Sequence, residues 1–144
     1  MAIKVILALG RDQGRPEVRE LILGQPDMKV VAEVSDGRAA VWIARKEAGN
    51  VIVLGLPLTS AAVIRAVEAA LAEPPGVKMV LVSPARGDRD VPGLLKAGAS
   101  AWVGAKHVGQ ELVAAIRAVA DGGTYLDSSG AVRSPQRKAA LTGE

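Results

Sequence analysis

The sequence contains no cysteine and no phenylalanine, and only one tyrosine and one histidine among its 144 residues. Without cysteine, disulfides, thiolate metal sites and cysteine nucleophiles are excluded. So few aromatic side chains provide no stacking platform for nucleic-acid bases. The first apolar run ends at Arg11 and Asp12, which makes it too short for a secretory signal or a membrane span. We therefore expect a cytoplasmic protein that makes no membrane contact.

The basic charge of the chain is concentrated near its end. The net charge is +3, but residues 1–130 hold 15 Lys and Arg against 14 Asp and Glu. Most of the excess comes from Arg133, Arg137 and Lys138. A short basic tail is more often a solvated linker than a binding arm, so we expect no direct nucleic-acid binding by this domain.

Five short apolar runs rich in Val and Ile recur at nearly even spacing, at residues 3–9, 29–34, 51–56, 77–83 and 100–104. Continuous runs with little alternation are typical of strands buried on both faces. The second run has partial alternation, because Glu33 falls between apolar neighbours, and this favours an edge position. The runs therefore predict the strands of one parallel sheet.

Helical spacing separates the runs. Asp36 is a candidate N-cap for one helix, and another helix has apolar residues at three- and four-residue steps from Val63 to Leu71. The last helix places a single apolar stripe between Val108 and Val119 and stops at Gly122. Strand and helix in alternation predict an α/β, doubly wound fold. We expect one domain over residues 1–130 and a loose tail over 131–144.

Three stretches in this order resemble the receiver domain of two-component response regulators: QPDMKVVAEVSDGRAAVWIAR from residue 25, KAGASAWVGAK from residue 96 and ELVAAIRAVADGGTYL from residue 111. The likeness is to receivers that precede LuxR-type DNA-binding domains, and the final LTGE resembles the start of such a domain. The resemblance implies a flavodoxin-like, CheY-like fold with a five-stranded sheet in the order 2-1-3-4-5. It also implies a role in the phosphorelay of two-component signal transduction and in transcription regulation.

The resemblance implies a phosphorylation site that this chain does not reproduce. A working receiver holds Mg²⁺ on two acidic residues after the first strand and phosphorylates an aspartate after the third, helped by a Ser or Thr and a Lys. Alignment with this pattern places other residue types at most of these positions: Leu9 and Gly10 at the acidic pair, Gly55 at the nucleophile, Ser83 at the hydroxyl and Ala105 at the lysine.

Two neighbours of these positions carry charges of the required kind. Asp12 is close to the acidic pair, and Lys106 follows Ala105. One step along an extended strand end points a side chain to the other face, so Lys106 is not a direct substitute. Gly55 itself has two readings, a replaced nucleophile or a simple turn residue after a buried strand. Both readings leave no nucleophile at this position. From the alignment as a whole we expect a pseudo-receiver that is not phosphorylated and has no metal or other cofactor.

Trp102 falls at the position that receivers use for an aromatic switch residue, and a purely apolar role at the sheet edge is an equal alternative. For His107, the N-terminus of the last helix or a solvated loop is the expected place, because no Ser or Cys has a motif that would pair with it. The chain has no catalytic triad, metal cluster or paired acids, so we expect no enzymatic activity.

Two functions fit these patterns. The first is a signalling module that forms a homodimer through the last helix, at Ala114, Arg117 and Ala118, and controls an attached LuxR-type DNA-binding domain or another protein partner. The second is a sensor in which a small organic ligand fills the vacated acidic pocket among Leu9, Gly10, Gly55, Ser83 and Ala105. The sequence does not identify the promoter, the partner or the ligand.

Overall fold

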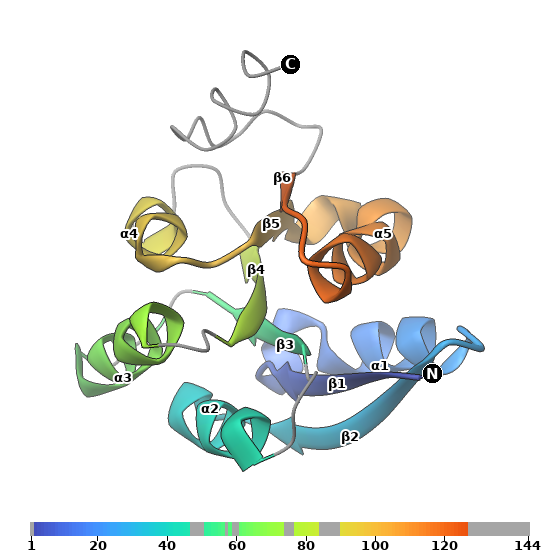
Figure 1. The fold of residues 1–144 in the computed structure, drawn as a ribbon. Coiled ribbons are helices and arrows are strands. Elements are labelled where there is room, and N and C mark those ends of the chain that lie inside the picture. Colours follow the sequence, from blue (N-terminus) through green and yellow to red (C-terminus); the bar gives the residue numbers. More distant parts are fainter. Residues whose placement is uncertain are drawn as a thin grey trace, which may run out of the picture.

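The computed structural model describes residues 2–46, 51–56, 58, 61–73, 77–83 and 90–126. Its centre is a parallel sheet in the order β2-β1-β3-β4-β5-β6 (Figure 1). The strands are β1 (Ile3–Ala8), β2 (Met28–Val34), β3 (Val51–Gly55), β4 (Lys78–Ser83), β5 (Ala101–Gly104) and β6 (Tyr125–Leu126). The predicted tail, residues 131–144, lies outside the described residues.

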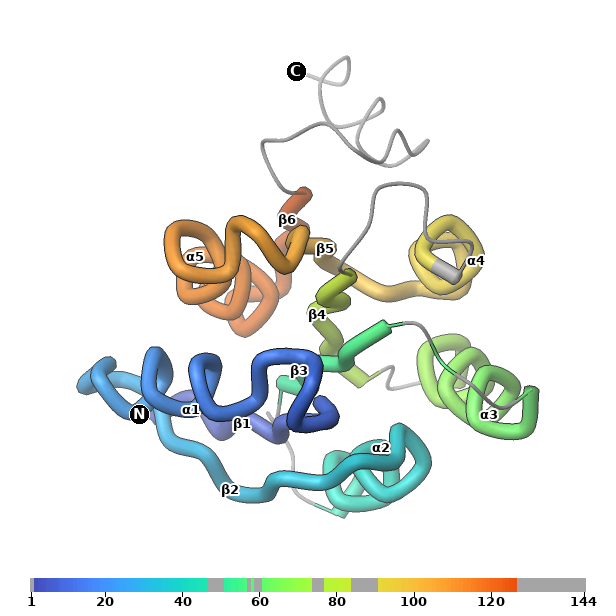
Figure 2. The backbone as a smooth tube through the Cα atoms, turned by 180° about the vertical axis from the view of Figure 1, so that it is seen from behind, coloured from blue at the N-terminus to red at the C-terminus, as the bar shows by residue number. Residues whose placement is uncertain are grey.

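Helices cover both faces of the sheet. They are α1 (Arg15–Leu23), α2 (Gly37–Lys46), α3 (Ala61–Ala72), α4 (Asp90–Ala97) and α5 (Val108–Ala120), with 3-10 turns η1 (Arg11–Gln13) and η2 (Ala105–His107). Helices α1 and α5 lie on one face, and α2, α3 and α4 lie on the other (Figures 1 and 2). This is the doubly wound arrangement that the alternation of strands and helices predicts.

The side chains of each strand alternate between two apolar cores. On β1, Ile6 and Ala8 face the layer of α2, α3 and α4, whereas Val5 and Leu7 face α1 and α5. All four are almost fully buried. Burial of a large aliphatic side chain contributes roughly 1.5 to 3 kcal/mol, so these central strands dominate the stability of the fold.

The five predicted strands are confirmed, and β2 is an edge strand as its partial alternation indicates. The sixth strand was not predicted. It consists of Tyr125 and Leu126, which pair with Ala101 and Trp102 of β5. The backbone N–H of Tyr125 donates to the carbonyl of Ser100 at 3.0 Å. Two residues after a glycine turn give no periodic signal, so only the open edge of β5 creates this strand.

The predicted helix signals also correspond to structure. Asp36 accepts a hydrogen bond from the backbone N–H of Arg38 at 2.8 Å at the start of α2, and this bond lowers the pKa of Asp36. In α5, the buried stripe is Leu112, Ala115, Ile116 and Val119. Among the residues with a described structure, no helix combines the length and the apolarity needed to cross a membrane.

Candidate functional site

The carboxyl ends of β1 and β3 lie side by side and form the centre of the candidate site. Ala8 of β1 pairs with Leu54 of β3, which brings the next residues along the chain, Leu9 and Gly55, to the same edge. Leu9 is fully buried and Gly55 is buried beside it. Ligands of open α/β sheets bind at this edge, so these are the positions that decide the chemistry.

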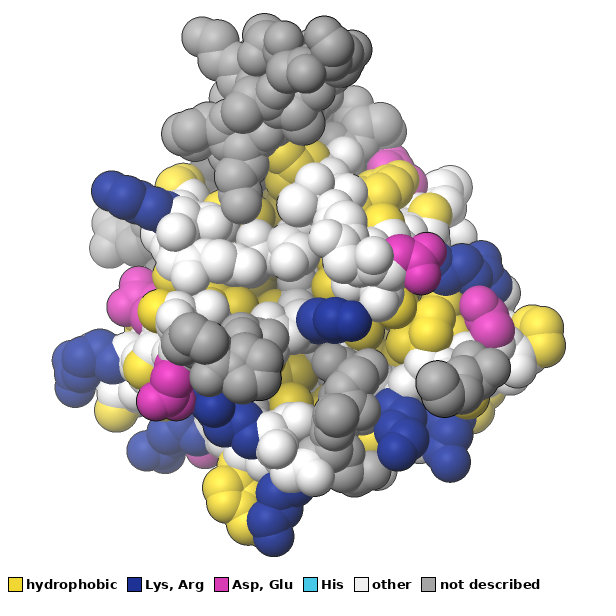
Figure 3. Space-filling model, viewed as in Figure 1, with side chains coloured by type: hydrophobic (Ala, Val, Ile, Leu, Met, Phe, Trp, Pro, Cys, Tyr) yellow, Lys and Arg dark blue, Asp and Glu magenta, His cyan; other side chains and the backbone are white. Residues whose placement is uncertain are grey.

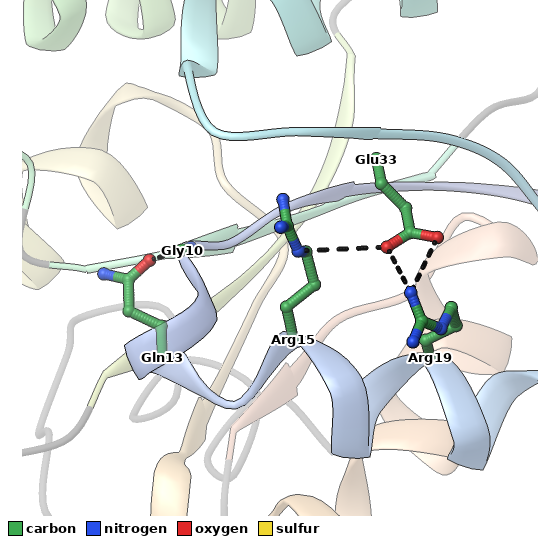
Figure 4. A network of polar contacts seen from close by, with 5 residues as sticks. All are labelled: Gly10, Gln13, Arg15, Arg19 and Glu33. Carbon is green, nitrogen blue, oxygen red and sulfur yellow. Dashed lines mark hydrogen bonds and ion pairs between the residues drawn. The ribbon is translucent and has the colours of Figure 1, made fainter.

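Gln13 of η1, which the sequence reasoning did not single out, turns its amide toward Gly10 at the end of β1 (Figure 4). Its Oε1 accepts a hydrogen bond of 2.7 Å from the backbone N–H of Gly10. Its Nε2 donates to the carbonyl of Leu56 at 3.3 Å. The amide thus connects the residues that follow β1 and β3. The sequence contains one signal for the first bond, because a Gln three residues after a helix N-cap often bonds back to the N-cap N–H.

The space beside Gly55 is already filled. A Cβ atom placed on Gly55 would lie 2.5 Å from Oε1 of Gln13 and 2.7 Å from Cδ2 of Leu9. Carbon atoms in favourable contact are about 3.5 to 4.0 Å apart, so no side chain fits there without movement of these neighbours. The side chains of Leu9 and Gln13 thus take up the space beside Gly55 in which the sequence predicts a vacated pocket.

The charged neighbours lie farther out. Asp12 is exposed in η1, and its Oδ1 would be 2.8 Å from a Cβ placed on Gly10. Ala105 and Lys106 are exposed in η2. Ser83 is buried at the end of β4, where it pairs with Gly104. No group of three or more His, Asp or Glu side chains suited to a metal ion occurs in the described part of the chain.

An ionic contact joins α1 to the edge strand next to the site. Arg19 of α1 lies 3.1 Å from the carboxylate of Glu33, and Arg15 lies 3.8 Å from it. Figure 4 shows both arginines pointing from α1 toward Glu33 on β2. These contacts give the exposed Glu33 of β2 a structural role, since its two cations come from the helix that begins directly after η1.

The predicted dimer surface on α5 has mixed exposure. Ala114 is exposed and Ala118 is half-buried. Arg117 forms a two-pronged pair with the carboxylate of Asp27, with both N to O distances 2.9 Å, and also donates to Gln25 at 3.0 Å. Hydrogen bonding to Arg117 lowers the pKa of Asp27, and the same bonds raise the pKa of Arg117. Arg117 therefore connects α5 to the loop before β2.

Charges elsewhere on the described surface are mixed. On the face drawn in Figure 3, basic side chains are interspersed with acidic and apolar ones. Trp42 is 61% exposed on α2, and the Nζ of Lys46 lies 4.2 Å from the centre of its ring. Such a contact is a cation–π interaction that covers part of the ring.

A cavity of about 740 Å³ lies between α1 and the N-terminus of α5. Apolar side chains contribute much of its lining: Val18, Leu21, Leu56, Val82 and Val108. Arg11, Asp12 and Gln13 also line it. Of the residues predicted to form a ligand pocket, only Ala105 lines this cavity, so the observed space lies beside the predicted one.

No family model matches this sequence. The chain is 26% identical over 124 residues to the transcriptional regulatory protein DegU of Brevibacillus brevis, a match that covers 86% of this chain and 52% of that regulator. This chain spans about half the length of the regulator. The fold is shared with the response regulator domain of Thermotoga maritima CheB, at 25% identity and a TM-score of 0.68, over 84% of this chain and 98% of that one.

The chain resembles response regulator receiver domains in sequence and shares their fold. A LuxR-family two-component response regulator from Aurantimonas sp. shares the fold over the whole of both chains, with a TM-score of 0.78 and 24% identity. Trp102, for which the sequence predicts either a switch role or a purely apolar role, is 2% exposed and packs in the core between the sheet and α2, α3 and α4. Its indole nitrogen has no hydrogen-bond partner among the described residues.

Proposed function

We propose that this receiver works without aspartyl phosphorylation, as the dimerising module of a transcription regulator with an attached LuxR-type DNA-binding domain. The proposal rests on which residues stand at the acceptor site. Gly55 offers no carboxylate, and Leu9 and Gln13 take up the space in which one would lie. A receiver that cannot gain a phosphoryl group has no covalent switch, so its partner contacts must already be available in the unmodified chain.

The match to DegU supports the regulatory part of this proposal, since that protein is a transcriptional regulator about twice as long as the matched region. The length that is unmatched in DegU leaves room for a second domain. In the receiver, β6 carries the chain to the edge of the sheet beside β5, and the sequence after Leu126 continues from there.

The dimer contact is tested on the unmodified chain. We expect light scattering to report a dimer at micromolar concentration. Ala114 is exposed on α5, and a small residue permits close approach of a partner helix. Ala114→Glu should therefore shift the chain toward the monomer. Ala69→Glu, the same change at an exposed alanine of α3, is the matched control and should leave the dimer intact. A monomer at all concentrations for the unsubstituted chain would contradict the proposal.

Small-molecule sensing is a second candidate, supported by the cavity between α1 and α5. Its volume of about 740 Å³ lies within the usual range of ligand pockets, roughly 300 to 1,000 Å³. A thermal-shift screen against metabolites tests it. A compound that binds there should raise the melting temperature of the chain and fail to do so for Val108→Trp, which puts a larger side chain at the wall of the cavity. Failure of every compound in a broad screen would remove this candidate.

A further inference from the structure

We infer that the Gln13 carboxamide is a built-in plug of the acceptor site, a positioning residue that fills the place of the missing acceptor and ties the end of β1 to the end of β3. The inference concerns the same site as the proposed function and rests on its assignment as an acceptor site. It adds that the site is closed by the chain itself, and that Gln13 and Gly55 depend on each other.

Space is the first support. Oε1 and Cδ of Gln13 would lie 2.5 Å and 2.9 Å from a Cβ on Gly55. The φ angle of Gly55 is not among the positive values found at described glycines, so the backbone there accommodates an L residue. What limits a side chain at position 55 is thus room rather than backbone freedom, and the Gln13 amide and the Leu9 side chain take up that room.

Hydrogen bonding is the second support. The Gln13 backbone N–H donates to the carbonyl of Gly10 at 3.0 Å, and the Gly10 N–H donates back to Oε1 at 2.7 Å. The remaining bond, from Nε2 to the carbonyl of Leu56, spans 43 positions of sequence. Leu56 is fully buried, and its own N–H donates to Val82 of β4 at 2.8 Å. The amide therefore connects the loop after β1 to the interior of the sheet.

A simpler reading makes Gln13 only a local cap of η1. Such a cap needs the bond to Gly10 and nothing else, and Glu serves it as well as Gln. A plug also needs the amide N–H for the Leu56 carbonyl and needs position 55 to lack a side chain. The two readings therefore differ at Gln13→Glu and at the coupling between residues 13 and 55.

A double-substitution cycle on this chain, followed by urea unfolding, tests the plug. Gly55→Ala should lower the folding equilibrium constant roughly ten- to a hundredfold, the usual range for an overfilled site. In the Gln13→Ala background, Gly55→Ala should lower the folding equilibrium constant by a smaller factor, less than about a third of the factor in the parent chain. The reason is that Leu9 can turn into the space that Gln13 leaves. Gly109→Ala is the matched control, since an added Cβ there meets nothing within 4 Å. Equal costs of Gly55→Ala in both backgrounds would overturn the inference.

Gln13→Glu provides a test that does not depend on whether Gly55→Ala folds. At neutral pH a carboxylate cannot donate to the Leu56 carbonyl, so this variant should unfold at a lower urea concentration than the parent chain. The deficit should shrink as the pH falls and the carboxyl becomes protonated and able to donate. A variant as stable as the parent at neutral pH would identify Gln13 as a local cap and overturn the plug. Both tests use neither phosphodonor nor DNA, so their failure is distinguishable from failure of the proposed function.

Discussion

The middle and the carboxyl end of β1 and β3 place different demands on their side chains. In the middle, Ile6, Ile52 and Val53 are fully buried and need only be apolar and of the right size. At the end, where a phosphorylatable receiver needs carboxylates to hold Mg²⁺ and accept phosphate, the alignment that we propose places Leu9 and Gly55. On that alignment, this chain keeps the first set and replaces the second. A fold comparison detects the first set and is insensitive to the second, so a receiver fold does not imply receiver chemistry.

The largest expected effect comes from the middle of a strand. Ile52→Ala removes a fully buried side chain between the sheet and α2, α3 and α4. Large-to-small changes of this kind cost about 2 to 5 kcal/mol of unfolding free energy. Urea unfolding monitored by circular dichroism measures it. Leu23→Ala on the surface of α1, where the side chain is 60% exposed, is the control. A loss below about 1 kcal/mol for Ile52→Ala would contradict the assignment of this layer as core.

A smaller effect is expected on the surface that connects α5 to β2. The pKa of Asp27 lies below its ordinary value of 3.8 because Arg117 donates hydrogen bonds to it. A lowered pKa in the folded chain contributes stability above 3.8 that is lost as the pH falls through the folded-state pKa. Asp27→Asn should therefore be slightly less stable than the parent at pH 7, and the difference should disappear in acid. Thermal unfolding across this pH range, with Asp121→Asn as control, measures the difference. A constant difference at all pH values would show that the pair contributes nothing through ionisation.

The smallest expected effect is that of Mg²⁺, which should leave the melting temperature unchanged at millimolar concentration. An ion that bound the native chain a thousandfold above its dissociation constant would add about 4 kcal/mol. Leu9, Gly10 and Gly55 provide no carboxylate at the strand ends. A clear rise in melting temperature that Asp12→Asn abolishes would show that the exposed Asp12 rebuilds a metal site, and the contrast between the strand middle and the strand end would fail.

The sequence predicts the structure of the strand middles better than the contacts at the strand ends. The apolar runs predict the first five strands, and the stripe on α5 is confirmed, because burial leaves a periodic pattern in the sequence. The plug at Gln13 depends on a bond to Leu56, 43 residues away, and the pair of Arg117 with Asp27 spans 90 residues. Such contacts form only when the chain folds, so no local sequence pattern predicts them. Arg117 was predicted to lie on the dimer surface, and that prediction did not include its hydrogen bonds to other residues of the same chain.

Intact-mass spectrometry after incubation with acetyl phosphate and Mg²⁺ tests most directly whether the strand ends have lost their phosphoryl acceptor. A phosphorylatable receiver with its acidic residues in place, treated in the same way, is the positive control. We expect the mass of this chain to stay unchanged, because Gly55 has no carboxylate and Gln13 and Leu9 fill its site. An acid-labile gain of about 80 Da, the mass of one phosphoryl group, that maps to an aspartate near the strand ends would contradict this expectation.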